Sequence, residues 1–198
     1  MVKLDTKYTI NNPYLLSHKT EAGLYWDIIL EASQRYNLQP SIIAGLGSRE
    51  SKWGLALKPP GPAGTGDCAE RKFPTKLRKG PLPPDGMGFG RGLMQIDWDA
   101  HLFARTGNWR DPRENIFYGC KVLTDCLAYI RKNISAANER GFEDQDFLQM
   151  ALAAYNCGPS RMLKAIQTGE GIDFYTTGKN YSENVLDRAG WFQNHGWA

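Results

Sequence analysis

SIIAGLGSRESKWG, residues 41–54, places one carboxylate within an otherwise apolar helical pattern. A helix that begins at Pro40 would carry four residues of this region on one face, at i, i+3, i+7 and i+10: Ile43, Leu46, Glu50 and Trp53. We therefore expect the carboxyl group of Glu50 to point toward a core or a cleft.

Burial would hold the proton of Glu50 to a higher pH than usual, because desolvation disfavours the charged form of a carboxyl group. The protonated form is the one that a general acid needs. The alternative is a structural role, in which Arg49 or Arg91 neutralises a buried Glu50. For an isolated glutamate the structural role is the more common, so the motifs further along the chain decide between the two.

Length and composition favour one soluble domain over residues 1–198. The chain has 198 residues, and 41% of them are hydrophobic, which is enough for one core. No apolar run approaches the roughly 20 residues of a bilayer span, and residues 1–14 lack the apolar centre of a signal peptide. We expect no membrane span, no signal peptide in this chain and a monomer.

The charge pattern gives little support for nucleic-acid binding. The net charge is only +3, and the basic residues cluster only in RKFPTKLRKG at residues 71–80. A loop of this kind could attract an anionic polysaccharide such as a bacterial wall, or it could be a solvated basic loop without a partner. We therefore predict no nucleic-acid partner.

The four cysteines, Cys68, Cys120, Cys126 and Cys157, have neither CxxC spacing nor neighbouring histidines. We therefore predict no metal site, and no cofactor is called for. Cys120 and Cys126 are six residues apart in a predicted helix and face different sides, which excludes a bridge between them if the helix is regular. A bridge from Cys68 to a distant cysteine and four free thiols are both compatible with the sequence.

Apolar residues at helical spacing predict a mainly α protein. Besides the helix of Glu50, we expect helices at residues 20–37, from Asp111 through Ile130, at residues 147–155, from a Ser160 cap to Ile166, and from a Ser182 cap to near Gly196. The helix at Asp111 has the clearest start, since Asp111 is a favourable N-cap and Pro112 suits the first helical position. It should be the long central helix of a bundle.

The amino-acid composition changes between the Glu50 helix and the central helix. Residues 57–84 are rich in proline, glycine and charge, and predict a long inserted loop beside the candidate site. GMGFGRGLMQI, residues 86–96, has four glycines and predicts tight turns and a small hairpin. It is not a nucleotide site, because no clear strand precedes it and no Lys-Ser or Lys-Thr follows. We expect this small Gly-rich lobe to form a substrate cleft with the helices.

Four motifs occur in order along the chain: GSRES at residues 47–51, GFGRGLMQID at 88–97, AAYNCGP at 153–159 and NYSENVLDRAGWFQNHGW at 180–197. Together they resemble the motifs of goose-type lysozymes and the related soluble lytic transglycosylases, glycoside hydrolase family 23. The last motif resembles the goose-type branch more closely. The resemblance implies an α+β lysozyme-like fold.

The resemblance also implies roles for individual residues. Glu50 matches the acid that protonates the glycosidic oxygen of a β-1,4-linked sugar chain. Gln95, Tyr155 and Asn156 match cleft residues that position the N-acetyl sugar or lie close to the acid, and Tyr181 matches a tyrosine that hydrogen-bonds near it. The competing structural roles are core packing for the two tyrosines and a backbone hydrogen bond for Gln95.

A second carboxylate separates hydrolysis from transglycosylation. An inverting hydrolase needs a base about 6.5–9.5 Å from the acid, whereas a lytic transglycosylase uses the 6-hydroxyl of the sugar and needs only the one glutamate. Asp97 and Asp85 match the two acidic positions that distinguish goose-type enzymes, although each also suits a turn. Glu70, in a loop that the avian enzymes replace with a short connection, is a third candidate base, a residue that reshapes the substrate subsites, or a solvated charge.

We therefore predict a muramidase that hydrolyses the β-1,4 bond between N-acetylmuramic acid and N-acetylglucosamine in peptidoglycan, by an inverting acid/base mechanism. It would act on the cell wall, outside the cytoplasm. The enzymatic alternatives are a chitinase and a lytic transglycosylase that gives 1,6-anhydro products. The alternative of another class is a sugar-binding module without turnover, but the presence of Glu50 together with Gln95 and Tyr155 argues against it.

Overall fold

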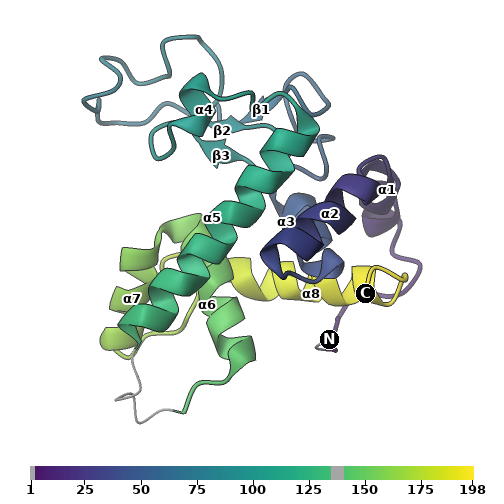
Figure 1. Ribbon diagram of the computed structural model, residues 1–198. Coiled ribbons are helices and arrows are strands. Elements are labelled where there is room, and N and C mark those ends of the chain that lie inside the picture. The colour runs from purple at the N-terminus through teal and green to yellow at the C-terminus, as the bar shows by residue number, and fades with distance from the viewer. Residues whose placement is uncertain (1–2, 135–140) are drawn as a thin grey trace.

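The computed structural model describes residues 3–134 and 141–198. Its helices are α1 (Pro13–Gly23), α2 (Trp26–Tyr36), α3 (Pro40–Glu50), α4 (Phe103–Thr106), α5 (Pro112–Asn133), α6 (Asp144–Cys157), α7 (Pro159–Gln167), α8 (Tyr181–Gln193) and a short 3-10 helix, Thr177–Lys179. In Figure 1, α5 runs from a small sheet at one end of the molecule to α6 and α7 at the other. None of the helices in the described ranges combines the length and apolar character of a membrane span. The predicted mainly α fold is confirmed.

The small lobe is an antiparallel sheet with the strand order β1-β2-β3. Its strands are β1 (Thr65–Gly66), β2 (Gly90–Arg91) and β3 (Ile96–Asp97). Gly90 lies opposite both Gly66 on β1 and Asp97 on β3. The predicted hairpin is therefore formed by β2 and β3, and the predicted long loop at residues 57–84 contains β1 as its one regular strand among the described residues.

Helix α3, which ends at Glu50, is buried on all sides and not only on one face. Every residue from Pro40 to Ser48 is buried. The helix packs against α8, and the two backbones meet at Gly45, where a Cβ would stand only 2.8 Å from the carbonyl oxygen of Val185. Only glycine fits there. This close contact holds the middle of α3 against α8, and Glu50 lies at the C-terminal end of the same helix.

The predicted apolar stripe is correct for Ile43 and Leu46, which are buried, but Trp53 does not continue the helix. The chain turns after Glu50, and Trp53 has a φ of 54°. Its indole Nε1 donates a hydrogen bond of 3.0 Å to the carbonyl oxygen of Ala44, so the ring packs back against α3. A turn, and not helical periodicity, therefore buries Trp53.

The start signal of the central helix is confirmed. Asp111 Oδ1 accepts a hydrogen bond of 2.9 Å from the backbone N–H of Glu114, and Pro112 occupies the first helical position. Helix α5 packs against α2, α6 and α7, so it connects the early and the late helices of the chain. This helix is the long central element that the sequence predicts.

The predicted helix at residues 20–37 is wrong, because this region contains the end of α1 and the separate helix α2. The break falls at Leu24, which is 71% exposed and so contributes nothing to the core. Helix α1 begins after Asn12, whose side chain accepts a hydrogen bond of 3.1 Å from the backbone N–H of Leu15. Asn12-Pro13 is a helix-start signal that sequence reasoning overlooked.

Two predicted helix caps, Ser160 and Ser182, are also wrong. Helix α7 begins at Pro159, because proline suits the first position, and Ser160 lies inside the first turn. Helix α8 begins at Tyr181, so Ser182 also lies inside the first turn. Its hydroxyl is buried and donates a hydrogen bond of 2.7 Å to Asp173 Oδ2. The residue that satisfies the start of α8 is therefore Asp173, eight residues before the helix.

Asp173→Ala should destabilise the protein by about 2–4 kcal/mol, because it leaves several buried donors without an acceptor. Asp173 is buried and accepts hydrogen bonds of 2.7–3.2 Å from the Ser182 backbone and hydroxyl, the Glu183 backbone and the Thr176 hydroxyl. Urea unfolding at constant pH measures the loss. Glu170→Ala, at an exposed position nearby, is the control. Equal midpoints for the two variants would contradict this assignment.

Candidate active site

A cleft of about 480 Å³ lies where the helical part meets the small lobe. Its lining residues come from the end of α3, the sheet and its loops, the end of α6 and the 3-10 helix: Glu50, Asp67, Arg71, Gly90, Gln95, Asp97, Tyr155, Asn156 and Thr177. Glu50, Gln95, Asp97, Tyr155 and Asn156 were predicted from the sequence as site residues. The fold therefore brings together side chains that lie more than a hundred positions apart.

Glu50 is partly buried at the C-terminal end of α3. The phenolic O–H of Tyr181, the first residue of α8, donates a hydrogen bond to Glu50 Oε1. The Arg49 guanidinium lies 5.4 Å from the centre of the Tyr181 ring. Burial raises the pKa of Glu50 to about 7, while the Tyr181 hydrogen bond and the Arg49 charge oppose that rise. A carboxyl group with this pKa is protonated over the pH range in which a general acid works.

The predicted sugar-contacting residues lie at the cleft, but their polar groups also serve the fold. Tyr155 O–H donates a hydrogen bond of 2.7 Å to the carbonyl oxygen of Met94, and burial holds the pKa of this phenol well above its ordinary value. Asn156 Oδ1 accepts a hydrogen bond of 2.9 Å from the backbone N–H of Thr177. These two residues tie α6 to the β lobe and to the segment before α8.

Gln95 occupies the tight turn between β2 and β3, with a φ of 49°. Its Nε2 donates a hydrogen bond of 2.8 Å to the carbonyl oxygen of Gly92. Its Oε1 would lie 2.2 Å from a Cβ at either Gly66 or Gly90, so these two glycines make room for the Gln95 side chain on the sheet. The backbone therefore satisfies the Gln95 amide, as in the structural alternative, and the residue also lines the cleft, while its contact with the sugar stays a prediction.

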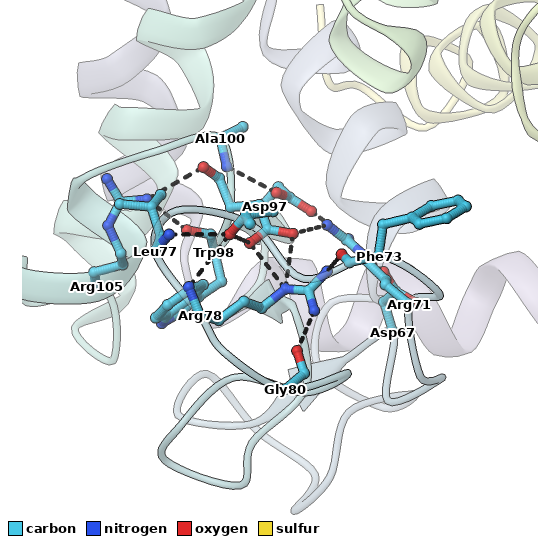
Figure 2. Close-up of polar contacts among 12 residues, drawn as sticks. Asp67, Arg71, Phe73, Leu77, Arg78, Gly80, Asp97, Trp98, Ala100 and Arg105 are labelled. Carbon is cyan, nitrogen blue, oxygen red and sulfur yellow. Dashed lines mark hydrogen bonds and ion pairs between the residues drawn. The ribbon is translucent and has the colours of Figure 1, made fainter.

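Two carboxylates of the small lobe face the cleft, and both contact Arg71. Asp97, at the end of β3, accepts from the backbone N–H of Ala100 at 2.9 Å with Oδ1 and from Arg71 with Oδ2 (Figure 2). Asp67, directly after β1, accepts from the same guanidinium nitrogen at 2.7 Å with Oδ2. Sequence reasoning missed Asp67 and Arg71, because only the pairing of β1 with β2 brings this part of the loop to the cleft.

The family model described as Lysozyme g matches residues 78–196. The chain is 30% identical over 173 residues to lysozyme g of Cyprinus carpio, and equally so to that of Casuarius casuarius, covering 87% of this chain and 75% of each relative. It is 31% identical over 175 residues to lysozyme g of Takifugu rubripes, covering 86% of this chain and 75% of the relative. The chain belongs to the lysozyme g family. As a member of that family it is a glycosidase, and the resemblance found in the four motifs is confirmed.

The structure places the two other predicted bases away from the lining of this lysozyme g cleft. Asp85 accepts hydrogen bonds of 2.9 Å and 3.0 Å from the two terminal nitrogens of the buried Arg91. Burial alone would raise the pKa of Asp85, but the bonds from Arg91 and the Met87 backbone outweigh it and lower the pKa. Glu70 is exposed in the loop. Asp85 therefore neutralises a buried cation, and Glu70 is a solvated charge.

The cysteines of this lysozyme g family member are free thiols. Cys120 and Cys126 are buried, Cys157 is partly buried and Cys68 is exposed. Burial raises the pKa of Cys120 and of Cys126 to about 12, so both are unreactive thiols at neutral pH. In the part of the chain that the structure describes, no three His, Cys, Asp or Glu side chains are grouped so that they could hold a metal ion.

Tyr181→Phe should move the alkaline limb of the pH–activity profile of this lysozyme g family member to higher pH, by about one unit. The Tyr181 hydrogen bond stabilises the charged form of Glu50, so its loss raises the pKa of Glu50 further above about 7. The protonated acid then persists to higher pH. The kcat/KM measured from pH 4 to 9 reports the shift. Tyr155→Phe is the control, since that hydroxyl bonds to Met94, and an equal shift in both variants would contradict the prediction.

Proposed function

We propose that this chain is a muramidase that cleaves the β-1,4 bond between N-acetylmuramic acid and N-acetylglucosamine in peptidoglycan, by inverting hydrolysis and as a monomer. The observation that carries the proposal is one cleft lined by Glu50, with its pKa raised to about 7, and by two carboxylates paired with Arg71. Such a protonated acid and separate carboxylates are the two components of inverting hydrolysis. The membership of the lysozyme g family supports the same substrate, and the place of action is the cell wall, outside the cytoplasm.

In the proposed reaction, the Glu50 carboxyl group gives its proton to the glycosidic oxygen as the bond from the sugar carbon to that oxygen breaks. A water molecule attacks the same carbon from the opposite face. Asp67 or Asp97 takes a proton from this water, so the product has the opposite configuration at that carbon. Asp97 has a donor on each oxygen, whereas Asp67 has a donor on Oδ2 alone among the described residues. Asp67 therefore replaces Asp85 as the second candidate base.

The other cleft residues position the substrate in this proposal. Gln95 belongs to the turn between β2 and β3 and Asn156 to the end of α6, so the small lobe and the helical part each supply an amide to the cleft lining. The amide groups of both residues suit the hydroxyl and N-acetyl groups of the sugar chain. The hydroxyl of Tyr155 is bonded to Met94, so Tyr155 contributes its ring and holds the β lobe in place.

Digestion of purified peptidoglycan and of chitin oligomers, followed by mass spectrometry and NMR of the new reducing ends, tests the proposed function. We expect cleavage of peptidoglycan with addition of one water, and an α configuration in the first product formed. Products lighter by one water would instead identify a lytic transglycosylase. Cleavage of chitin alone would identify a chitinase, and a β configuration would contradict inversion.

A further inference from the structure

One guanidinium nitrogen bridges the two carboxylates of the cleft. Arg71 Nη2 donates to Asp67 Oδ2 at 2.7 Å and also to Asp97 Oδ2 (Figure 2). Without a cation between them, two carboxylates close enough to share one nitrogen would repel each other. Burial disfavours the charge of Arg71, but the bonds to Asp97 and Asp67 outweigh burial and raise its pKa. Arg71 therefore stays charged between the two aspartates.

The guanidinium of Arg71 is fixed on its other sides as well. Nη1 donates a hydrogen bond of 3.0 Å to Asp99 Oδ2, and the guanidinium carbon lies 3.7 Å from the centre of the buried Phe89 ring. This distance corresponds to a cation stacked on an aromatic face. Phe89 itself is held by the sheet region, because its N–H donates to the carbonyl oxygen of Asp67 and its carbonyl oxygen accepts from Trp98. Arg71 thus has a single defined position.

A different arginine holds the loop together. Arg78 is 2% exposed, and its guanidinium donates to the carbonyl oxygens of Phe73 and Gly80 and, through Nε, to Asp99 at 3.2 Å (Figure 2). These bonds close the stretch from Phe73 to Gly80 without using Arg71. The loop therefore does not depend on the Arg71 guanidinium for these bonds, and the Arg71 side chain lines the cleft with about one-third of its surface exposed.

We propose that Arg71 is a positioning residue, which holds Asp67 and Asp97 side by side so that they act as one base site in the cleft that Glu50 also lines. This inference rests on the proposed hydrolysis. Arg71 lies before residues 78–196, which the family model matches. The inserted loop therefore supplies a part of the catalytic arrangement and is not merely a surface extension.

The geometry requires an arginine. Two N–H bonds leave Nη2, a third leaves Nη1, and the flat group stacks on Phe89. A lysine ammonium has the charge but neither the planar fork nor the stacking face, so it reproduces only a part of these contacts. Misplacement of a catalytic group by about 1 Å costs up to about a hundredfold in rate.

The test compares Arg71→Ala, Arg71→Lys and Lys72→Ala on soluble peptidoglycan fragments. Lys72 is the adjacent exposed residue, so its variant removes the same charge from the same loop. We expect Arg71→Ala to lower kcat by about 10- to 100-fold with KM changed less than about threefold, because positioning acts on the reaction and not on sugar binding. The kcat of Arg71→Lys should lie between that of Arg71→Ala and that of the wild type, and the kcat of Lys72→Ala should equal that of the wild type. Guanidinium at low millimolar concentration should restore part of the kcat of Arg71→Ala.

Two results would overturn the inference: an unchanged kcat in Arg71→Ala, or a loss that neither lysine nor guanidinium relieves, which would indicate a structural role. Thermal unfolding of each variant identifies the second case. Glu50→Gln separates this inference from the proposed function. If hydrolysis depends on Glu50 but not on Arg71, only the inference fails, whereas hydrolysis that is independent of Glu50 contradicts the proposed function itself.

Discussion

Glu50→Gln should abolish the lysis of bacterial cells and lower kcat on peptidoglycan fragments by about 10²- to 10⁴-fold, which is the usual contribution of a general acid. The amide keeps the size of the side chain and can still accept a hydrogen bond from Tyr181, but it has no proton to give to the leaving oxygen. Binding of oligosaccharide should stay largely intact. Calorimetric titration with the uncleaved sugar chain, alongside a turbidity assay of lysis, measures both. Lysis at the wild-type rate would refute Glu50 as the acid.

Stability measurements provide the control for this variant. The pKa of Glu50 is raised in the folded state to about 7, from an ordinary value of 4.5, so the folded protein binds more protons between these two pH values. The contribution of Glu50 to stability is therefore present below pH 4.5 and is lost as the pH rises to about 7. Glutamine does not titrate. At pH 8 we expect Glu50→Gln to be more stable than the wild type by about 1–3 kcal/mol, which separates loss of the acid from loss of the fold.

The second large effect is expected at the pair of carboxylates. Asp67→Asn and Asp97→Asn should each lower kcat, and the double variant should lose about 10²- to 10⁴-fold, as expected for removal of a general base. Because both carboxylates contact Arg71, the two effects should not add. If one single variant loses as much kcat as the double variant, the aspartate that it replaces is the base. Initial rates on soluble peptidoglycan fragments at the pH optimum give the comparison.

Glu70→Gln is the matched control for the carboxylate pair. Glu70 and Asp67 are both exposed in the same loop, but Glu70 lies outside the lining of the cleft, so its variant should keep the wild-type kcat within about twofold. Wild-type rates in the double variant of Asp67 and Asp97 would exclude both as the base. A loss of kcat in Glu70→Gln equal to that of the pair would identify Glu70 as the candidate base instead.

The helical part of the fold was predictable wherever local signals determine the structure. Asp111 and Pro112 define the start of α5 by a cap and a fixed backbone angle, and both act within one turn. The helix at residues 20–37 was wrong because apolar spacing continues through the turn at Leu24, and periodicity does not detect a break that keeps the spacing. Trp53 is a similar case, since a turn buries it at a position that helical spacing also predicts.

Sequence motifs predicted only one of the two aspartates that line the cleft. Asp97 follows directly from GLMQID, and the structure places it at the cleft. Asp85 also precedes a glycine motif, but the buried Arg91 needs a counter-charge and takes it. Asp67 reaches the cleft only because β1 pairs with β2, which places Gly66 opposite Gly90 across the loop between them. No spacing within the loop encodes that pairing.

The sequence alone determined the family resemblance and the mainly α architecture, and it predicted Glu50 as the acid, because these depend on short motifs and on the period of apolar residues. The tertiary structure decided which carboxylates line the cleft with Glu50 and that Arg71 lies between Asp67 and Asp97, and it supplied the contact from Tyr181 to Glu50 that the resemblance implied. The physical reason is that a charged side chain that is partly removed from water needs an opposite charge beside it, and this need decides which charged groups pair in the cleft. That neutralisation depends on distances in space, which residues far apart in the chain acquire only on folding.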